Sequence, residues 1–159
     1  MLKQFRQKLN TARHLSGWEK GWFVKLYFMS GLIRLITVIF PFQRVSRYLG
    51  NYHRNFQVST LVSEEQLVTA NQFKKIIQLV CRYTPWHCHC LVQAIIAAYF
   101  FKHYEIPYVL YLGAKLNRGQ DKLKAHAWLM IKNQIITGKQ GYKAYRIVGC
   151  YLSPLIVAA

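Results

Sequence analysis

Acidic residues are scarce in this chain. Its 159 residues include 22 Lys and Arg but only 5 Asp and Glu, a formal net charge of +17, and no Asp or Glu follows Asp121. This imbalance favours an acidic partner, which could be nucleic acid, an anionic membrane surface or an acidic peptide. The basic residues are spread singly, without zinc-finger spacing or an RNA-recognition signature. Nucleic acid is therefore the least supported of the three partners.

Two kinds of apolar segment are also missing. The N-terminal stretch MLKQFRQKLNTARHL is charged and has no apolar centre, so it does not fit a secretory signal. The most apolar part runs from Trp18 to Phe42, but Lys25 and Arg34 interrupt it before it reaches the roughly 18 residues that a membrane span needs. We expect a buried or partner-facing helix here, with a membrane surface as the alternative. The chain is accordingly expected to be cytoplasmic, with membrane association as a second option.

Cysteine is rare as well, with Cys81, Cys88, Cys90 and Cys150 the only four. In a reducing cytosol we expect free thiols rather than a disulfide framework. The string HCHC at 87–90 offers soft zinc ligands, but Cys150 stands alone, and residues two apart on a helix point to different faces. No metal and no cofactor is expected.

Periodicity predicts that the first half of the chain is helical. Residues 2–14 fit a short amphipathic helix, and residues 43–62 show no sustained period. A helix should begin at Ser63, because Gln66 three residues later completes a capping box. Its apolar face comprises Leu67, Phe73, Ile76, Ile77, Val80 and Cys81. A further helix is expected from about residue 88 to 103, where the sequence becomes LVQAIIAAYFFKH.

The second half changes to short alternating segments typical of strands. Strands are predicted in PYVLYLGAKL from Pro107, with Gly113 as a bulge, then at 125–131, in QIIT after a Lys132–Asn133 turn, and at 144–148. A helix packed on an antiparallel sheet is an α+β arrangement. We expect a helical N-terminal extension over residues 1–60 and an α+β core over residues 61–159.

Cys90 and His126 form a candidate nucleophile–base pair. Cys90 follows the loop that Pro85 and Trp86 close and begins the apolar helix, where the helix dipole and a neighbouring imidazole favour the reactive thiolate. His126 lies on a predicted strand between two small alanines, which leaves room for a substrate backbone. A helix-start thiol and a strand imidazole are the minimal pair of a thiol acyl-transfer enzyme. Without that pairing, Cys90 would be an ordinary small core residue and His126 a half-buried strand residue.

The remaining five histidines lack such a context. His14, His53, His89 and His103 are interpreted as surface or packing residues, and so is His87, with lining of the substrate path as its alternative role.

The pattern PW-x-x-x-CL at 85–91, followed by a helix, a strand and AHAW at 125–128, resembles the transglutaminase-like cysteine peptidases that remove leader peptides in lasso-peptide biosynthesis. The resemblance covers roughly residues 84–153 and implies a papain/transglutaminase-like core with Cys90 as nucleophile and His126 as base. It also implies a ribosomally made precursor peptide as substrate and an ATP-dependent lasso cyclase as partner. No leader-recognition domain fits in the apolar residues 1–60, so a separate leader-recognition protein is expected.

The residue that orients the imidazole departs from this family. Relatives carry an acidic residue about a dozen positions after the histidine, and this chain has none there. A two-residue Lys132–Asn133 turn would place Lys139 opposite His126 and Thr137 diagonally across. Thr137 is the first candidate for the orienting residue, and Gln140, by analogy with the amide of papain-like enzymes, is the second.

Two rival functions follow from the same features. One is a non-catalytic basic adaptor that binds an acidic peptide or a membrane surface, and the other is a transglutaminase-like acyltransferase. Rapid thiol labelling would separate the enzymes from the adaptor, because only an activated cysteine reacts quickly.

Overall fold

The computed structural model describes residues 15–53, 60–117 and 122–156. The expected helix at 2–14 lies outside these residues. In chain order the elements are α2 (Gly17–Ile39), α3 (Phe42–Ser46), β1 (Asn51–His53), α4 (Glu64–Tyr83), α5 (Cys90–His103), β2 (Val109–Asn117), β3 (Lys122–Ile131), β4 (Gln134–Thr137), the 3-10 turn η1 (Tyr142–Ala144) and β5 (Arg146–Leu152). The predicted α+β class is confirmed, and so is the helical character of the N-terminal part.

Local sequence signals set the ends of the two long helices. The predicted capping box at Ser63 and Gln66 is present at the start of α4, and an equivalent one, formed by Ser16 and Glu19, starts α2. Both helices end at a residue with extended backbone, Thr84 and Phe40. In each case a proline follows, and the residue before a proline is disfavoured in the helical region.

The five strands form one antiparallel sheet in the order β1-β5-β2-β3-β4. The predicted irregularity at Gly113 is confirmed as a register shift between β2 and β5. The predicted turn at Lys132 and Asn133 is also found, with Lys132 at φ 53°. Sequence analysis missed α3 and β1, because both are short and owe their form to neighbours: β1 exists only as an edge pairing with β5.

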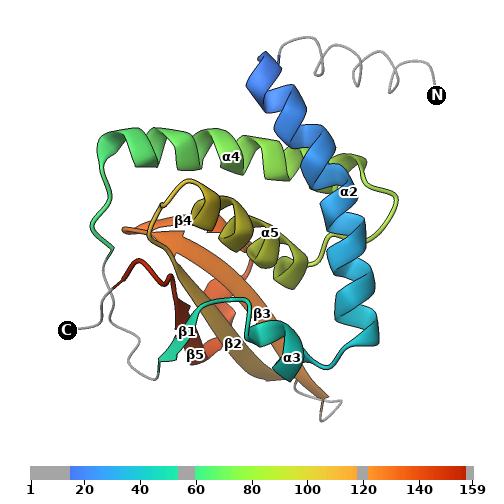
Figure 1. Cartoon of the computed structure of the whole chain (residues 1–159). Helices are drawn as coiled ribbons and strands as arrows, with labels where there is room; N and C mark the ends of the chain where they lie inside the picture. The colour runs from blue at the N-terminus through green and yellow to red at the C-terminus, as the bar shows by residue number, and fades with distance from the viewer. Residues whose placement is uncertain (1–14, 54–59, 118–121, 157–159) are drawn as a thin grey trace.

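The helical layer covers one face of the sheet, and α5 lies at its centre (Figure 1). This helix contacts β3 and β4 on one side and α2 and α4 on the other. Because it is covered on both sides, α5 is apolar on most of its surface, and seven of its residues are buried. Phe73 of α4 stacks on Phe100 of α5 with ring centroids 3.7 Å apart, which ties the two helices together.

A second, smaller core lies on the opposite face of the sheet. Tyr111, Trp128 and Cys150 are buried there and pack against Tyr142 of η1 and Tyr145. Burial raises the pKa of the Cys150 thiol, which also donates to the carbonyl oxygen of His53 at 3.4 Å. Cys150 is therefore a structural thiol on the far side of the sheet from α5.

Helix α2 requires a correction to the sequence analysis. It is long and apolar enough to cross a membrane, and 17% of its most apolar window is buried. The two cations in this 18-residue segment, Lys25 and Arg34, therefore do not exclude a membrane span on length and composition. Core helices of soluble proteins and signal sequences meet the same criteria. In the structure one side of α2 packs on α4 and α5 through Trp22, Leu26 and Ile33.

Candidate active site

Cys90 is the first residue of α5, as predicted. Its thiol is free and half-buried, and the helix axis behind it runs into the core. The amides of the first helical turn have no intrahelical acceptor, so they present partial positive charge around this residue. These amides therefore offer hydrogen-bond donors to a negatively charged group beside the Cys90 sulfur.

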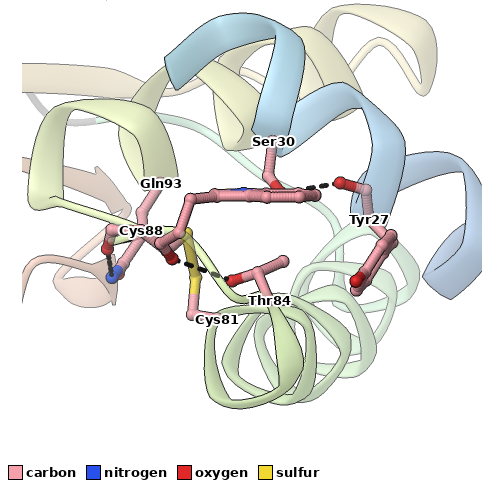
Figure 2. The surroundings of a disulfide bond; sticks show 7 residues. Tyr27, Ser30, Cys81, Thr84, Cys88 and Gln93 are labelled. Carbon is pink, nitrogen blue, oxygen red and sulfur yellow. Dashed lines mark hydrogen bonds between the residues drawn. A yellow bond between two sulfur atoms is a disulfide. The ribbon is translucent and has the colours of Figure 1, made fainter. Parts of the chain in front are cut away.

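The loop that leads into Cys90 is held from both sides (Figure 2). Gln93, one turn into α5, donates from its side-chain amide to the carbonyl oxygen of Cys88 at 2.8 Å. The Thr84 hydroxyl donates to the carbonyl oxygen of Trp86 at 3.3 Å. These bonds fix the backbone immediately before Cys90.

A disulfide between Cys81 and Cys88 adds a covalent link from the end of α4 to this loop (Figure 2). The expectation that all four thiols are reduced was wrong on this point. The error arose because cysteine usage was judged from the assumed compartment, whereas the chain reversal at Pro85 brings the two Cα atoms within 5.2 Å. The bond also removes Cys88 from the candidate nucleophiles and metal ligands.

Trp86 connects the same loop to α2. Its indole Nε1 donates to the Ser30 hydroxyl at 2.9 Å, and its ring lies 5.2 Å from that of Tyr27. A side chain at Gly31 would meet the indole, since a Cβ there would lie 2.9 Å from it. The Pro-Trp part of the motif thus has a structural role, because it sets the nucleophile loop against the N-terminal helix.

His126 lies on β3 opposite Gly113 of β2. Its Nε2 is 2.8 Å from the carbonyl oxygen of Gly138, and its ring stacks on Tyr145 at 4.9 Å between centroids. A carbonyl oxygen only accepts hydrogen bonds, so Nε2 must carry the proton. In the neutral ring Nδ1 is then the basic nitrogen, free to take a proton from a thiol.

The register of β3 and β4 differs from the one expected. Leu129 pairs with Thr137 across a bulge between Leu129 and Met130, so Lys139 is not opposite His126 as a regular hairpin would place it. The bulge adds one residue to β4 relative to β3. The strand ends at Thr137, and the carbonyl oxygen of the next residue, Gly138, faces the imidazole.

Thr137 is buried and lines the same cavity as Cys90 and His126, and so does Gln140. Among the described residues the Thr137 hydroxyl has no hydrogen-bond partner. The imidazole donates its hydrogen bond to the carbonyl oxygen of Gly138 instead, a residue that sequence analysis did not consider. The sequence feature that could have indicated Gly138 is a glycine directly after a predicted strand. Its φ of 72° lies in the left-handed region that favours glycine. Substitution of Thr137 would test the predicted orienting role of this residue against that of the Gly138 carbonyl.

Two cavities meet at Cys90 and His126. The first, about 260 Å³, is almost wholly apolar and is lined by Phe42, Cys90, Leu91, Leu112, Gly113, Ala114, Leu123, Ala125, His126, Ala127 and Val148. The second, about 500 Å³, is the more polar of the two, because polar and apolar groups both line it. Its lining residues are Lys74, Ile77, Gln78, Cys90, Gln93, His126, Ile136, Thr137, Gly138, Lys139 and Gln140. The alanines that flank His126 both belong to the apolar cavity, which matches their predicted role of leaving room beside the imidazole.

The other histidines make a different set of contacts. His87 and His89 are exposed and stack on each other at 5.6 Å between centroids. The pKa of His89 is lowered by partial burial, then by the Arg34 guanidinium and His87. His103 packs against Trp22, and His14 lies outside the described residues. No group of three or more His, Cys, Asp or Glu in the described part of the chain could hold a metal ion.

A helix-start thiol and a strand-borne imidazole beside shared cavities over an antiparallel sheet form the arrangement that Cys–His thiol enzymes use. The family model of the transglutaminase-like superfamily matches residues 36–150, which include α3, α4, α5 and most of the sheet. The chain belongs to this superfamily, whose general activity is that of a cysteine peptidase or acyltransferase. No curated protein and no solved structure matches the chain. The match begins within α2, and the expected boundary at residue 60 stays a prediction.

Proposed function

We propose that this protein is a cysteine peptidase that removes the leader peptide from a lasso-peptide precursor. The observation that carries the proposal is that Cys90, at the start of α5, and His126, on β3, line the same two cavities in a chain of the transglutaminase-like superfamily. An apolar and a polar cavity on either side of the pair suit an extended peptide, whose side chains would enter both.

The reaction follows from the two side chains. His126 Nδ1 takes the thiol proton of Cys90, and the thiolate attacks the scissile carbonyl carbon to form a tetrahedral intermediate. The backbone amide of Cys90 is the proposed donor to the oxyanion, because the first amides of a helix have no intrahelical acceptor. The C–N bond then breaks as His126 gives its proton to the leaving amine. Water, deprotonated by His126, hydrolyses the thioester and restores the thiol.

Partners are part of the proposal. The described residues before α4 pack on the catalytic half through α2 and β1, so we propose that a separate protein recognises the leader. The substrate would be a ribosomally made precursor, and an ATP-dependent lasso cyclase would take the released core peptide.

The experiment combines the purified chain, the precursor and the leader-recognition protein, and follows products by mass spectrometry. Two fragments whose masses sum to precursor plus one water support the peptidase. A product in which an amine has replaced water would establish the acyltransferase instead. An unmodified precursor, together with a Cys90 that iodoacetamide does not alkylate rapidly, would establish the non-catalytic adaptor.

A further inference from the structure

The polar cavity beside Cys90 and His126 contains two cations. Lys74 projects from α4, and Lys139 follows β4. The Lys74 ammonium is half-buried and donates to the carbonyl oxygen of Ile135 at 2.7 Å, which holds it at the cavity wall. None of the described residues that line this cavity is Asp or Glu.

The two lysines are close enough to act on each other. The pKa of Lys74 is lowered, first by burial and then by the positive charge of Lys139. Two like charges at one cavity repel, and a bound anion would relieve this repulsion. Gln78 and Gln140 supply neutral hydrogen-bonding groups on the same wall.

We propose that this cavity is a carboxylate subsite, which binds an Asp or Glu side chain of the peptide close to the bond that Cys90 attacks. The proposal rests on the proposed peptidase function and names its substrate class: a peptide with an acidic side chain on one side of the scissile bond and an apolar side chain on the other, in the cavity with Phe42, Leu123 and Val148.

Alkylation of Cys90 tests the subsite without any peptide. Iodoacetate carries a carboxylate and iodoacetamide does not. The rate of Cys90 alkylation by iodoacetate, divided by the rate with iodoacetamide, is measured by mass spectrometry. Dividing this ratio by the same ratio for N-acetylcysteine amide gives the local preference for an anion. We expect a normalised ratio several-fold above one at low ionic strength, which decreases as salt is added. Cys150 is buried and gives no competing signal.

Substitution of each lysine tests whether Lys74 and Lys139 cause the preference for the anionic reagent. Lys139→Met and Lys74→Met should bring the ratio close to one, whereas Lys75→Met, an exposed neighbour on the same helix, should not change it. Lys139 is exposed, so its replacement does not threaten the fold as loss of the Lys74 hydrogen bond could. A wild-type ratio near one, or a ratio unchanged in Lys139→Met, would overturn the subsite and leave the peptidase standing. If neither reagent labels Cys90, both proposals fail.

A separate observation concerns the outer face of α2. Its inner face is buried, but Val24, Phe28, Leu32, Leu35 and Val38 are each more than half exposed and recur every three or four residues. This spacing places them in one stripe along the helix. Ile39, Phe40 and Phe42 continue the apolar surface beyond the helix end.

Charge indicates what would cover this stripe. The chain carries a net charge of +17, so a second copy would be repelled, whereas an anionic bilayer would attract it. Crossing the bilayer would expose Trp22, Leu26 and Ile33 of the inner face and break the bond between Ser30 and Trp86. We infer that α2 lies in the interface of an anionic membrane, with its outer stripe in the acyl boundary and its inner face still on the domain.

Vesicle sedimentation tests this inference. The full chain should sediment with phosphatidylcholine vesicles that contain phosphatidylglycerol and much less with phosphatidylcholine alone. The double variant L32E/L35E should lose at least tenfold in binding with an unchanged circular dichroism spectrum. Val68→Glu, at an equally exposed apolar site on α4, is the matched control and should bind as wild type. Full binding by L32E/L35E, or a wild-type dimer that these substitutions dissociate, would overturn the inference.

Discussion

At the scale of single residues, the site is distinguished by the positions of two atoms, the Cys90 sulfur and the Gly138 carbonyl oxygen. The first stands at a helix start, and the second fixes which nitrogen of His126 is basic. Neither feature needs a carboxylate. A thiol ionises more readily than a hydroxyl and depends less on a strongly polarised base, so a Cys–His pair can function with a neutral group that sets the tautomer.

The nucleophile assignment gives the first prediction. Cys90→Ala should abolish leader removal, because no other free thiol lines the two cavities. Cys88→Ala should retain most of it, since the bond from Gln93 goes to the backbone of Cys88 and survives the substitution. The measurement is the initial rate of product formation. Equal loss in both variants would contradict the assignment of Cys90.

The orienting carbonyl gives a second prediction. A side chain at Gly138 would overlap the carbonyl oxygen of Ala127 and contact Trp128, and the positive φ adds strain. Gly138→Ala should therefore displace the carbonyl from His126 and lower kcat more than tenfold. Gly141→Ala is the control, since Gly141 has a similar φ of 74° and open space around it. If both variants lose activity equally, backbone strain alone is the cause.

Thr137→Val separates the hydroxyl from the carbonyl as the orienting group. The Thr137 hydroxyl is buried without a partner among the described residues. We therefore expect the valine variant to keep its kcat and to gain about 1 kcal/mol in the free energy of unfolding, because an unpaired buried polar group is removed. A loss of turnover of more than tenfold at unchanged stability would instead assign the orienting role to Thr137.

At the scale of elements, the turn from α4 to α5 positions Cys90, the proposed nucleophile. The disulfide, the two loop hydrogen bonds and the indole of Trp86 fix this turn relative to α2, α4 and α5. The position of the Cys90 thiol therefore depends on three helices, and one of them, α2, lies mostly outside residues 36–150, the part that matches the superfamily model.

Removal of the disulfide is a prediction at this scale. Closing so short a loop restricts the unfolded chain by about 2 kcal/mol, so Cys81→Ser should lower the free energy of unfolding by roughly that amount. Denaturant unfolding of wild type with and without a reductant should reproduce the same difference. A wild type that is insensitive to the reductant would show that Cys81 and Cys88 do not form the bond in solution.

At the scale of the whole molecule, a net charge of +17 is combined with two adjoining cavities, one apolar and one that contains Lys74 and Lys139. This distribution suits an acidic peptide delivered to these cavities by another protein. We predict that the isolated chain processes its precursor poorly at low substrate concentration and that adding the leader-recognition protein raises kcat/KM. Efficient cleavage by the purified chain alone would contradict the need for this partner.

Local signals in the sequence determined most of the secondary structure and the fold class of this protein. The capping box at Ser63, the apolar run after Cys90 and the turn at Lys132 each act within a few residues, so helix starts, strand positions and the α+β class could be predicted. Cys90 and His126 could be selected because each lies in a recognisable local context.

Tertiary structure decided what depends on distant partners. The disulfide needs the reversal between α4 and α5, β1 needs β5 beside it, and the indole of Trp86 needs Ser30 of α2. The bulge between β3 and β4 placed the Gly138 carbonyl on His126 where a regular hairpin would have placed a side chain. A shift of one residue in strand pairing changes every facing group, and no local pattern records it.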